Sequence, residues 1–462
     1  MNQPGDEPMR ETEPTPTAAR GDGFHTGVDD PHHTRVRKAL WVTSWDGVLA
    51  TACENAGPPF AAIYALALGA GNVEIGLLAA LPALAGNVLQ LPAAALGDRI
   101  GRRKLLVLIS GFSSRLLWLP ILLIPFLFTG RTAFILFLSL MVLRSALGAL
   151  GAPAWTSLVA DIAPRRLRGN YFANRTIYCN VAALIATLVA GWLIKHGGNP
   201  WGFVAVFAGS LVTGVGASLF FSRLPEPPEA VRKARQALAV PLRERLQLIR
   251  RQLKNERNFS GFTLSSLIWT FAVTMPGPLF VIYFVKVLGG DANDWGIVTA
   301  ATMIATMFGQ RYWGRLVGRL GEKNVMVVSG AFVAFIPLFW CLIGSPTWAI
   351  AINLFGGLAW AGYNLAAFNL LLQATPDGRR QTFVAAYNAG IGLSSAAAPI
   401  IGTLLSGLMG IKLVLLLSCV GRYAALAAFS RLVQGPPRRL DWRLFVPRLP
   451  GLHRRSYRQL SR

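Results

Sequence analysis

The chain has 462 residues, of which 53% are hydrophobic and only 14% are charged, and its mean hydropathy is +0.45. Because average soluble globular chains carry about 25% charged residues, this composition excludes one soluble domain that buries its apolar surface in a single core. The formal net charge of +24 lies mostly in the loops between apolar segments. We therefore interpret it as membrane topology and not as a nucleic-acid surface.

Residues 1–38 combine Pro, Gly and acidic side chains and contain no apolar core. They match neither a signal peptide nor a membrane span. The composition predicts a disordered N-terminal tail.

Twelve apolar stretches follow, each long enough to cross a bilayer, which takes about 20 residues. They predict an all-α membrane protein with twelve transmembrane helices. The stretches cover 40–69, 73–95, 105–128, 132–160, 171–194, 201–222, 259–287, 294–317, 325–345, 347–374, 382–408 and 411–433.

The loops between these stretches alternate between basic and nearly uncharged. The basic set includes 99–104, 165–168, 223–258, 315–323 and 379–380, together with the C-terminal tail. Cytoplasmic loops are enriched in Lys and Arg. We therefore expect a multi-pass protein of the cell membrane with both termini in the cytoplasm.

The chain repeats itself. An offset of 220 residues aligns Gly57 with Gly277, Pro58 with Pro278 and Gly101 with Gly321. Two pseudo-symmetric halves of six spans each are predicted, 39–222 and 259–433, related by an axis along the membrane normal because each half holds an even number of spans. A basic cytoplasmic linker, 223–258, joins them, and 434–462 forms a basic cytoplasmic tail.

The loop after the second span reads ALGDRIGRRK (95–104) and is dense in charge. It resembles the loop signature of the major facilitator superfamily of secondary transporters, which it matches at Asp98, Arg99, Gly101, Arg102, Arg103 and Lys104, with Ala94 where the family has Gly. A weaker copy in the second half keeps Arg319 and Gly321. The resemblance implies that these residues form a conformational switch. A loop that only sets topology would explain the cations but not Asp98.

Span four contains Arg144 and Gly148, which are similar to a second signature of this family. A charge near the bilayer centre costs about 2.5–3.5 kcal/mol on insertion scales, so Arg144 should face the interior and have a partner. Asp46 and Glu54, about two helical turns apart in span one, are the candidate partners. We expect Glu54 or Asp46 to bind a coupling proton while Arg144 modulates it; the alternative is a static ion pair.

Other polar and aromatic residues at span depth are candidates for lining a substrate cavity. Each could instead join helices or anchor them at the membrane surface. These candidates are Asn55, Asn87, Gln90, Gln310, Tyr363, Asn364, Tyr387 and Asn388.

The expected function is secondary active transport of a small molecule by alternating access, coupled to protons. Export of a lipophilic or amphipathic compound is favoured over import on the aromatic residues alone. A nutrient uptake permease, a uniporter and a non-transporting sensor or lipid-handling protein are the alternatives.

An enzyme is not expected, because the sequence shows no Ser/His/Asp, metal-binding or phosphate-binding pattern. Neither a metal nor a cofactor follows from the four scattered cysteines. The expected partners are a small-molecule substrate, protons and the lipid bilayer, and a monomer suffices because one chain holds both halves.

Overall fold

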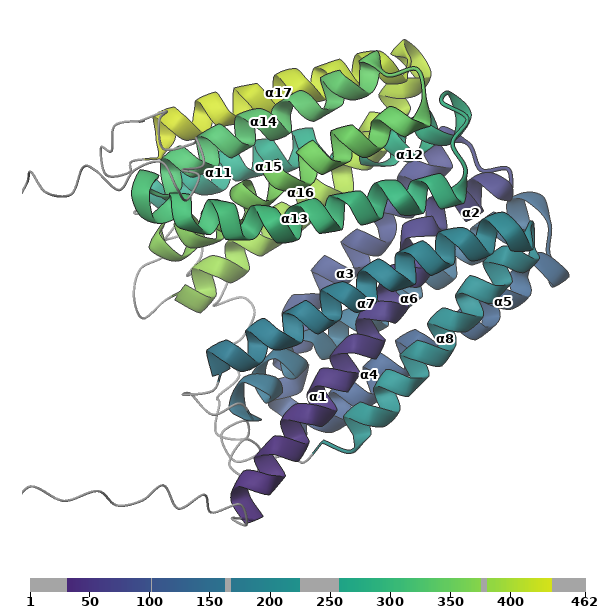
Figure 1. The fold of residues 1–462 in the computed structure, drawn as a ribbon, viewed down its shortest axis with the longest axis vertical. Helices are drawn as coiled ribbons and strands as arrows, with labels where there is room; N and C mark the ends of the chain where they lie inside the picture. The colour runs from purple at the N-terminus through teal and green to yellow at the C-terminus, as the bar shows by residue number, and fades with distance from the viewer. Residues whose placement is uncertain (1–30, 101, 163–167, 225–256, 375–379, 434–462) are drawn as a thin grey trace, which may run out of the picture.

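The computed structural model describes residues 31–100, 102–162, 168–224, 257–374 and 380–433 (Figure 1). These residues form helices, with no β-strand among them. The predicted all-α class is confirmed for this part of the chain. The linker 223–258 and the C-terminal tail lie almost wholly outside it.

The first half begins with α1 (Pro31–Ala56), the short helix η1 (Pro58–Phe60) and α2 (Ala61–Ala67). These three helices follow one another as one broken rod. Pro58 and Pro59 interrupt it, because proline has no backbone N–H to continue the helical hydrogen bonding. The half continues with α3 (Asn72–Ile100), α4 (Arg103–Leu116), α5 (Trp118–Leu127), α6 (Gly130–Ile162), α7 (Arg168–Gly197) and α8 (Trp201–Ser222).

The second half begins with a similarly broken rod, α11 (Arg257–Thr274) followed by α12 (Gly277–Lys286), with Pro276 at the break. It continues with α13 (Ala292–Leu320), α14 (Glu322–Leu342), α15 (Pro346–Ala374), α16 (Arg380–Met409) and α17 (Ile411–Leu432).

Ten stretches of the described chain are long and apolar enough to cross a membrane. They lie in α3, α4 with α5, α6, α7, α8, α11 with α12, α14, α15, α16 and α17. The predicted count of twelve is therefore not fully confirmed. The two remaining rods are long, with 26 residues in α1 and 29 in α13, but both carry several charged side chains that lower their hydropathy.

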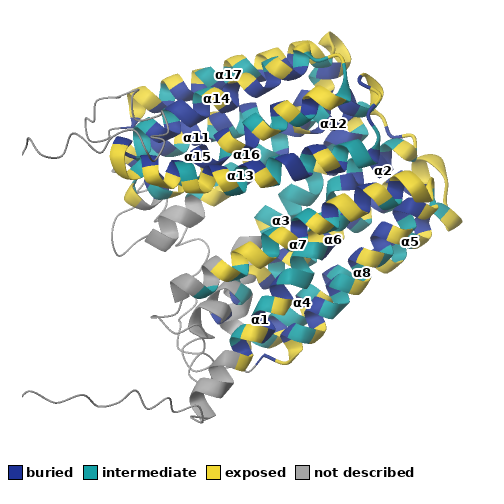
Figure 2. Ribbon diagram, in the orientation of Figure 1, coloured by how far each residue is buried: buried dark blue, intermediate teal, exposed yellow. Residues whose placement is uncertain are grey.

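Corresponding helices of the two halves make corresponding contacts. In the first half, α1 packs on α7 and α8, while α3 and α4 pack on α6; in the second, α11 packs on α16 and α17, while α13 and α14 pack on α15. One hydrophobic core lies around Trp269, Trp313 and Tyr363 in the second half. The other lies around Tyr64 and Trp118 in the first half and extends across the contact between the halves to Leu279 and Ile282. Many large apolar residues are exposed, as helices that face lipid require. Figure 2 shows exposed positions along the outer helices of both halves.

The halves meet where α3 contacts α16 and where α7 contacts α13. Figure 1 shows the two groups of helices together at the end that holds α2 and α12, and diverging toward the end where α1 begins. Near the joined end, a Cβ at Gly191 would lie 2.9 Å from the Ala292 carbonyl oxygen, so only glycine allows this approach of α7 to α13. Lys195 Nζ lies 2.9 Å from Asp291 Oδ2 across the same contact.

Candidate functional site

A cavity of about 610 Å³ lies inside the first half, between α1, α4, α6 and the start of α7. We call it the charged cavity, because four of its lining residues are Asp46, Glu54, Arg115 and Arg175. Ionisable side chains at span depth are rare and mark functional positions in membrane proteins. This cavity is therefore the candidate functional site.

Arg144 pairs with Glu54 at the wall of the charged cavity, through Nη2 and Oε1. The Arg144 side chain is 8% exposed and lies over the Trp118 ring at 4.8 Å, whereas the Glu54 side chain is 54% exposed. Ser114 Oγ donates to the Arg144 carbonyl at 2.8 Å. The cation is thus fixed in the helix bundle, and the carboxylate opens toward the cavity.

Asp46, the other predicted acid, faces a different cation. Its Oδ1 lies 4.0 Å from Arg115 Nη2, and only 3% of the residue is exposed. Arg115 also donates from Nη1 to Ser218 Oγ at 2.7 Å. Gly214 leaves room for the Arg115 stem, since a Cβ there would lie 3.0 Å from its Cγ. Asp46 also interacts electrostatically with Arg175, so it lies between two arginines, whereas Glu54 pairs with Arg144.

Arg175 completes the cationic wall. Its Nε donates to the Thr43 carbonyl at 3.2 Å, and its guanidinium carbon lies 5.1 Å from the centre of the Trp155 ring. A Cβ at Gly47 would overlap this guanidinium, so the group lies directly against α1. Among the described residues, no carboxylate forms an ion pair with Arg175.

A second cavity, of about 430 Å³, lies between the halves and is lined by α1, α7, α13 and α15. We call it the amide cavity, because Asn55, Asn180, Gln310 and Asn353 line it. Thr302 Oγ1 donates to Asn353 Oδ1 at 3.0 Å. Asn55 and Thr51 line both the charged and the amide cavity, so the two cavities share one wall.

A third cavity, of about 570 Å³, lies at the joined end between α3 and the broken rods of both halves. Its lining is mainly apolar and includes Pro58, Pro278 and Pro399. None of the predicted site residues lines it.

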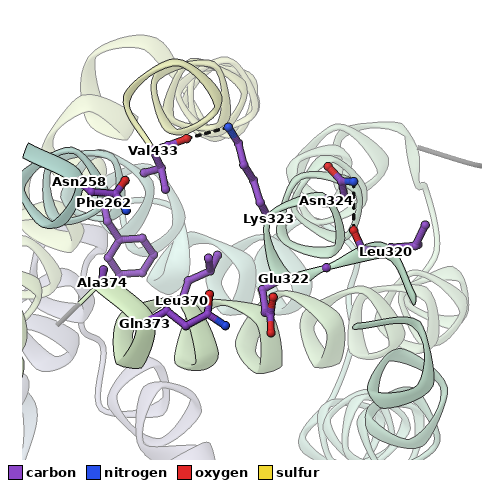
Figure 3. A pocket seen from close by; sticks show the side chains of 11 residues that line it. Asn258, Phe262, Leu320, Glu322, Lys323, Asn324, Leu370, Gln373, Ala374 and Val433 are labelled. Carbon is purple, nitrogen blue, oxygen red and sulfur yellow. Dashed lines mark hydrogen bonds between the residues drawn. The ribbon is translucent and has the colours of Figure 1, made fainter. Parts of the chain in front are cut away.

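A smaller cavity of about 190 Å³ lies in the second half, where α14 begins and α17 ends (Figure 3). Lys323 Nζ donates to the Val433 carbonyl at 2.7 Å, and Asn324 donates to the Leu320 carbonyl at 3.1 Å. These bonds tie helix ends together. Of the predicted site residues, Gly321 lines this cavity, at the turn between α13 and α14.

Of the remaining predicted cavity residues, several are packed instead. Tyr363 is 6% exposed and stacks on Trp269 with ring centres 4.4 Å apart, and Tyr387 stacks on Phe262 at 5.6 Å. The Asn87 side chain lies against Gly392 at the contact of α3 with α16. These residues fill the core or the contact between the halves.

The other cavity candidates lie elsewhere. Asn364 and Asn388 are exposed and line none of the cavities above. The side chain of Gln90 lies outside the described part of the structure.

The predicted conformational switch is only partly visible. Asp98 and Arg99 lie near the end of α3 with side chains outside the described part, and Gly101 also lies outside it. Arg102 precedes α4, which starts with Arg103 and Lys104.

The second-half copy of this loop is described. Arg319 is exposed in the last turn of α13, and Gly321 has a φ of +79°, which favours glycine. The role of all these residues stays a prediction.

Arg115, Arg175 and Arg422 were not among the predicted site residues. Arg422, in α17, is only 2% exposed. Each is an arginine inside or beside an apolar stretch, the same signal that identified Arg144. Among the described residues, no group of three or more His, Cys, Asp or Glu side chains could hold a metal ion.

Comparison with known proteins agrees with this architecture. The family model of the Major Facilitator Superfamily matches residues 47–291 and 262–450. An uncharacterized MFS-type transporter of Methanocaldococcus jannaschii is 25% identical over 297 residues, which cover 64% of this chain and 71% of that protein.

Solved structures with the same fold include three transporters. The match to the nucleoside transporter NupG covers 86% of this chain and 98% of the NupG chain, with a TM-score of 0.66 at 13% identity. A D-xylose-proton symporter covers the same shares, with a TM-score of 0.66 at 14% identity. An inward-facing, occupied bacterial homolog of the human lysosomal transporter Spinster covers 87% and 98%, with a TM-score of 0.61 at 17% identity. The chain belongs to the major facilitator superfamily.

Proposed function

We propose that this transporter is driven by protons and that Glu54 is the group that binds the coupling proton. The observation that carries the proposal is the pair of Glu54 with Arg144 at the wall of the charged cavity. Glu54 is open to the cavity while Arg144 is held by Trp118 and the bundle. Protonation of Glu54 would remove its charge and release Arg144, so one proton would rearrange the centre of the first half.

Alternating access would come from rocking of the two halves about the contacts of α3 with α16 and of α7 with α13. The diverging end is the end that the basic loops assign to the cytoplasm, so we take this conformation as inward-facing. Opening to the outside would require the Lys195 and Asp291 side chains to separate. Asp98 and Arg99, with the second copy at Arg319 and Gly321, would act as the cytoplasmic switch in this movement.

The cargo that we propose is a small polar molecule. The preference for a lipophilic exported compound depended on aromatic cavity residues, and Tyr363 and Tyr387 pack in the core of the second half. Charged and amide side chains line the charged and amide cavities instead. We further propose that the protein is not an enzyme and acts as a monomer in the cell membrane, with both termini in the cytoplasm.

The experiment uses purified full-length protein in liposomes that contain a pH-sensitive dye. A library of small compounds is screened with and without an imposed proton gradient, for wild type, Glu54→Gln and the control Glu74→Gln. Glu74 accepts a hydrogen bond from the Gly71 amide at 2.7 Å, away from the charged cavity. We expect substrate-dependent proton movement in wild type and in the control, and its loss in Glu54→Gln.

Substrate flux without proton movement, unchanged in Glu54→Gln, would contradict the proposal and indicate uniport or another coupling ion. Absence of flux for every compound would favour the sensor or lipid-handling alternative.

A further inference from the structure

The charged cavity has an excess of positive charge. Its lining holds two carboxylates, Asp46 and Glu54, and two guanidinium groups, Arg115 and Arg175. Glu54 is already paired with a third guanidinium, that of Arg144, which is not a lining residue. An arginine that faces a cavity inside a helix bundle and has no carboxylate of its own can take its counter-charge from a ligand. The described residues leave one guanidinium in this position.

Arg175 is the arginine of this group that forms no ion pair among the described residues, and it shares the charge of Asp46 with Arg115. Glu54 binds Arg144 directly and Asp46 lies 4.0 Å from Arg115, whereas Arg175 donates its one hydrogen bond to a described residue from Nε, to the Thr43 carbonyl. Its two terminal nitrogens have no hydrogen-bond partner among the described residues. Gly47 and the Trp155 ring hold the guanidinium in place at the cavity wall.

We propose that the transported molecule carries an anionic group, a carboxylate or a phosphate, and that Arg175 binds this group in the charged cavity. The planar guanidinium fork matches both groups with two parallel hydrogen bonds. This inference rests on the proposed function and adds the chemical class of the substrate.

The same geometry links the anion to the proton. Protonation of Glu54 removes a negative charge from the cavity wall and frees Arg144, so the cavity attracts an anion more strongly. Proton and anion therefore bind cooperatively, and the cycle that follows is symport. By reciprocity, the bound anion also raises the affinity for the proton.

The rest of the substrate has a place as well. Thr51 and Asn55 line both the charged and the amide cavity, so a molecule anchored at Arg175 can reach the neutral donors and acceptors of Asn180 and Asn353. An anionic small molecule with hydroxyl or amide groups fits this pair of cavities.

The test measures the thermal unfolding midpoint of the full-length protein in detergent, at constant ionic strength. The probes are matched pairs that differ in one anionic group: glucuronate and glucose, gluconate and sorbitol, uridine monophosphate and uridine, glycerol 3-phosphate and glycerol. Inorganic phosphate and sulfate are added separately. We expect at least one anionic member to raise the midpoint where its neutral partner does not.

Four variants test whether the stabilisation by the anionic probe depends on Arg175. Arg175→Gln should weaken binding of the active anion at least about tenfold, because a charge-assisted hydrogen bond is lost. Arg175→Lys should bind with intermediate affinity, and Gly47→Ala, which keeps the charge but displaces the guanidinium, should also weaken binding. Arg131→Gln, an exposed cation at the joined end, should bind like wild type.

Equal effects of anionic and neutral partners, an anion effect that survives in Arg175→Gln, or no effect of any anion would overturn the inference. Its failure is separable from that of the proposed function: proton-coupled flux of an uncharged compound, intact in Arg175→Gln and lost in Glu54→Gln, would leave the proton coupling standing and remove the anionic substrate.

Discussion

The two halves of the transporter share their helix packing but not their buried chemistry. The first half surrounds a cavity with paired acids and arginines. The second half has an aromatic core, and Arg422 is its buried arginine. At the positions 220 residues after Asp46 and Glu54, the second half has Ser266 and Thr274. Symmetry of the fold therefore does not extend to the charges.

Arg422 satisfies backbone groups instead of facing a carboxylate. Its Nη1 donates to the Val333 carbonyl at 2.9 Å, which lies four residues before Pro337. That carbonyl lacks its usual helical partner because proline has no N–H. Ser418, one turn earlier in α17, donates to the Ala272 carbonyl at 2.6 Å, four residues before Pro276. The helix α17 thus compensates for proline breaks in α14 and α11.

The comparison shows that a buried arginine in a membrane helix can have either of two roles. In the first half, Arg144 pairs with a titratable group beside a cavity. In the second, Arg422 replaces missing main-chain hydrogen bonds. Variants of both halves can separate these roles, since one should change transport and the other stability.

The largest effect is expected for Arg144→Met. This change removes the partner of Glu54, and a hydrogen bond to a charged group contributes up to about 3 kcal/mol, which corresponds to roughly 100-fold. We expect transport in liposomes to fall by about this factor while the protein still folds, because the exposed Glu54 can be solvated. A large loss of thermal stability with normal transport would reverse the roles assigned to the two halves.

Arg422→Met should have the opposite result. It leaves the Val333 carbonyl without a donor, and an unsatisfied buried group costs about 1–3 kcal/mol. We expect a lower midpoint of thermal unfolding, with turnover per folded molecule within about a factor of two of wild type. Lost turnover in protein that is fully folded would show that the second half also takes part in the chemistry.

Ser418→Ala should have a smaller effect of the same kind. It removes one neutral hydrogen bond to the Ala272 carbonyl, which is typically worth about 1 kcal/mol. The thermal midpoint should fall less than in Arg422→Met. Ser430→Ala is a matched control, since Ser430 donates to the Ala427 carbonyl on an exposed turn and should leave the midpoint unchanged.

The smallest effect is expected at the pair of Lys195 and Asp291 between the halves. Burial raises the pKa of Asp291, but the Asp294 backbone amide and the Lys195 side chain outweigh this and lower its pKa below the ordinary value. A lowered carboxyl pKa stabilises the fold above its unfolded pKa, and this contribution is lost only as the pH falls through the folded pKa. The pair should therefore not respond to pH between about 5 and 8.

Lys195→Gln tests this pair. Both side chains are largely open to solvent, so the change should lower the thermal midpoint only slightly, and the difference should vanish at about 1 M salt. A difference that changes between pH 5 and pH 8 would contradict the expected charge state of Asp291.

The sequence by itself determined the class of the protein. The length of the apolar stretches and the alternation of basic loops are imposed on the chain by the bilayer, and the 220-residue alignment offset reflects the internal repeat. The family match confirmed the resemblance that the segment ALGDRIGRRK had indicated. The sequence also predicted that Arg144 has a partner, because a charged side chain inside a membrane span requires one.

Only the tertiary structure decided which groups meet. Glu54 and Arg144 are 90 residues apart, and hydropathy carries no information on which of two acids on α1 faces which arginine. The same holds for Arg175, whose position depends on contact with Gly47 and Trp155, and for Tyr363, whose ring packs in the core. Partner choice depends on distances across the bundle, which arise only when separate helices pack together.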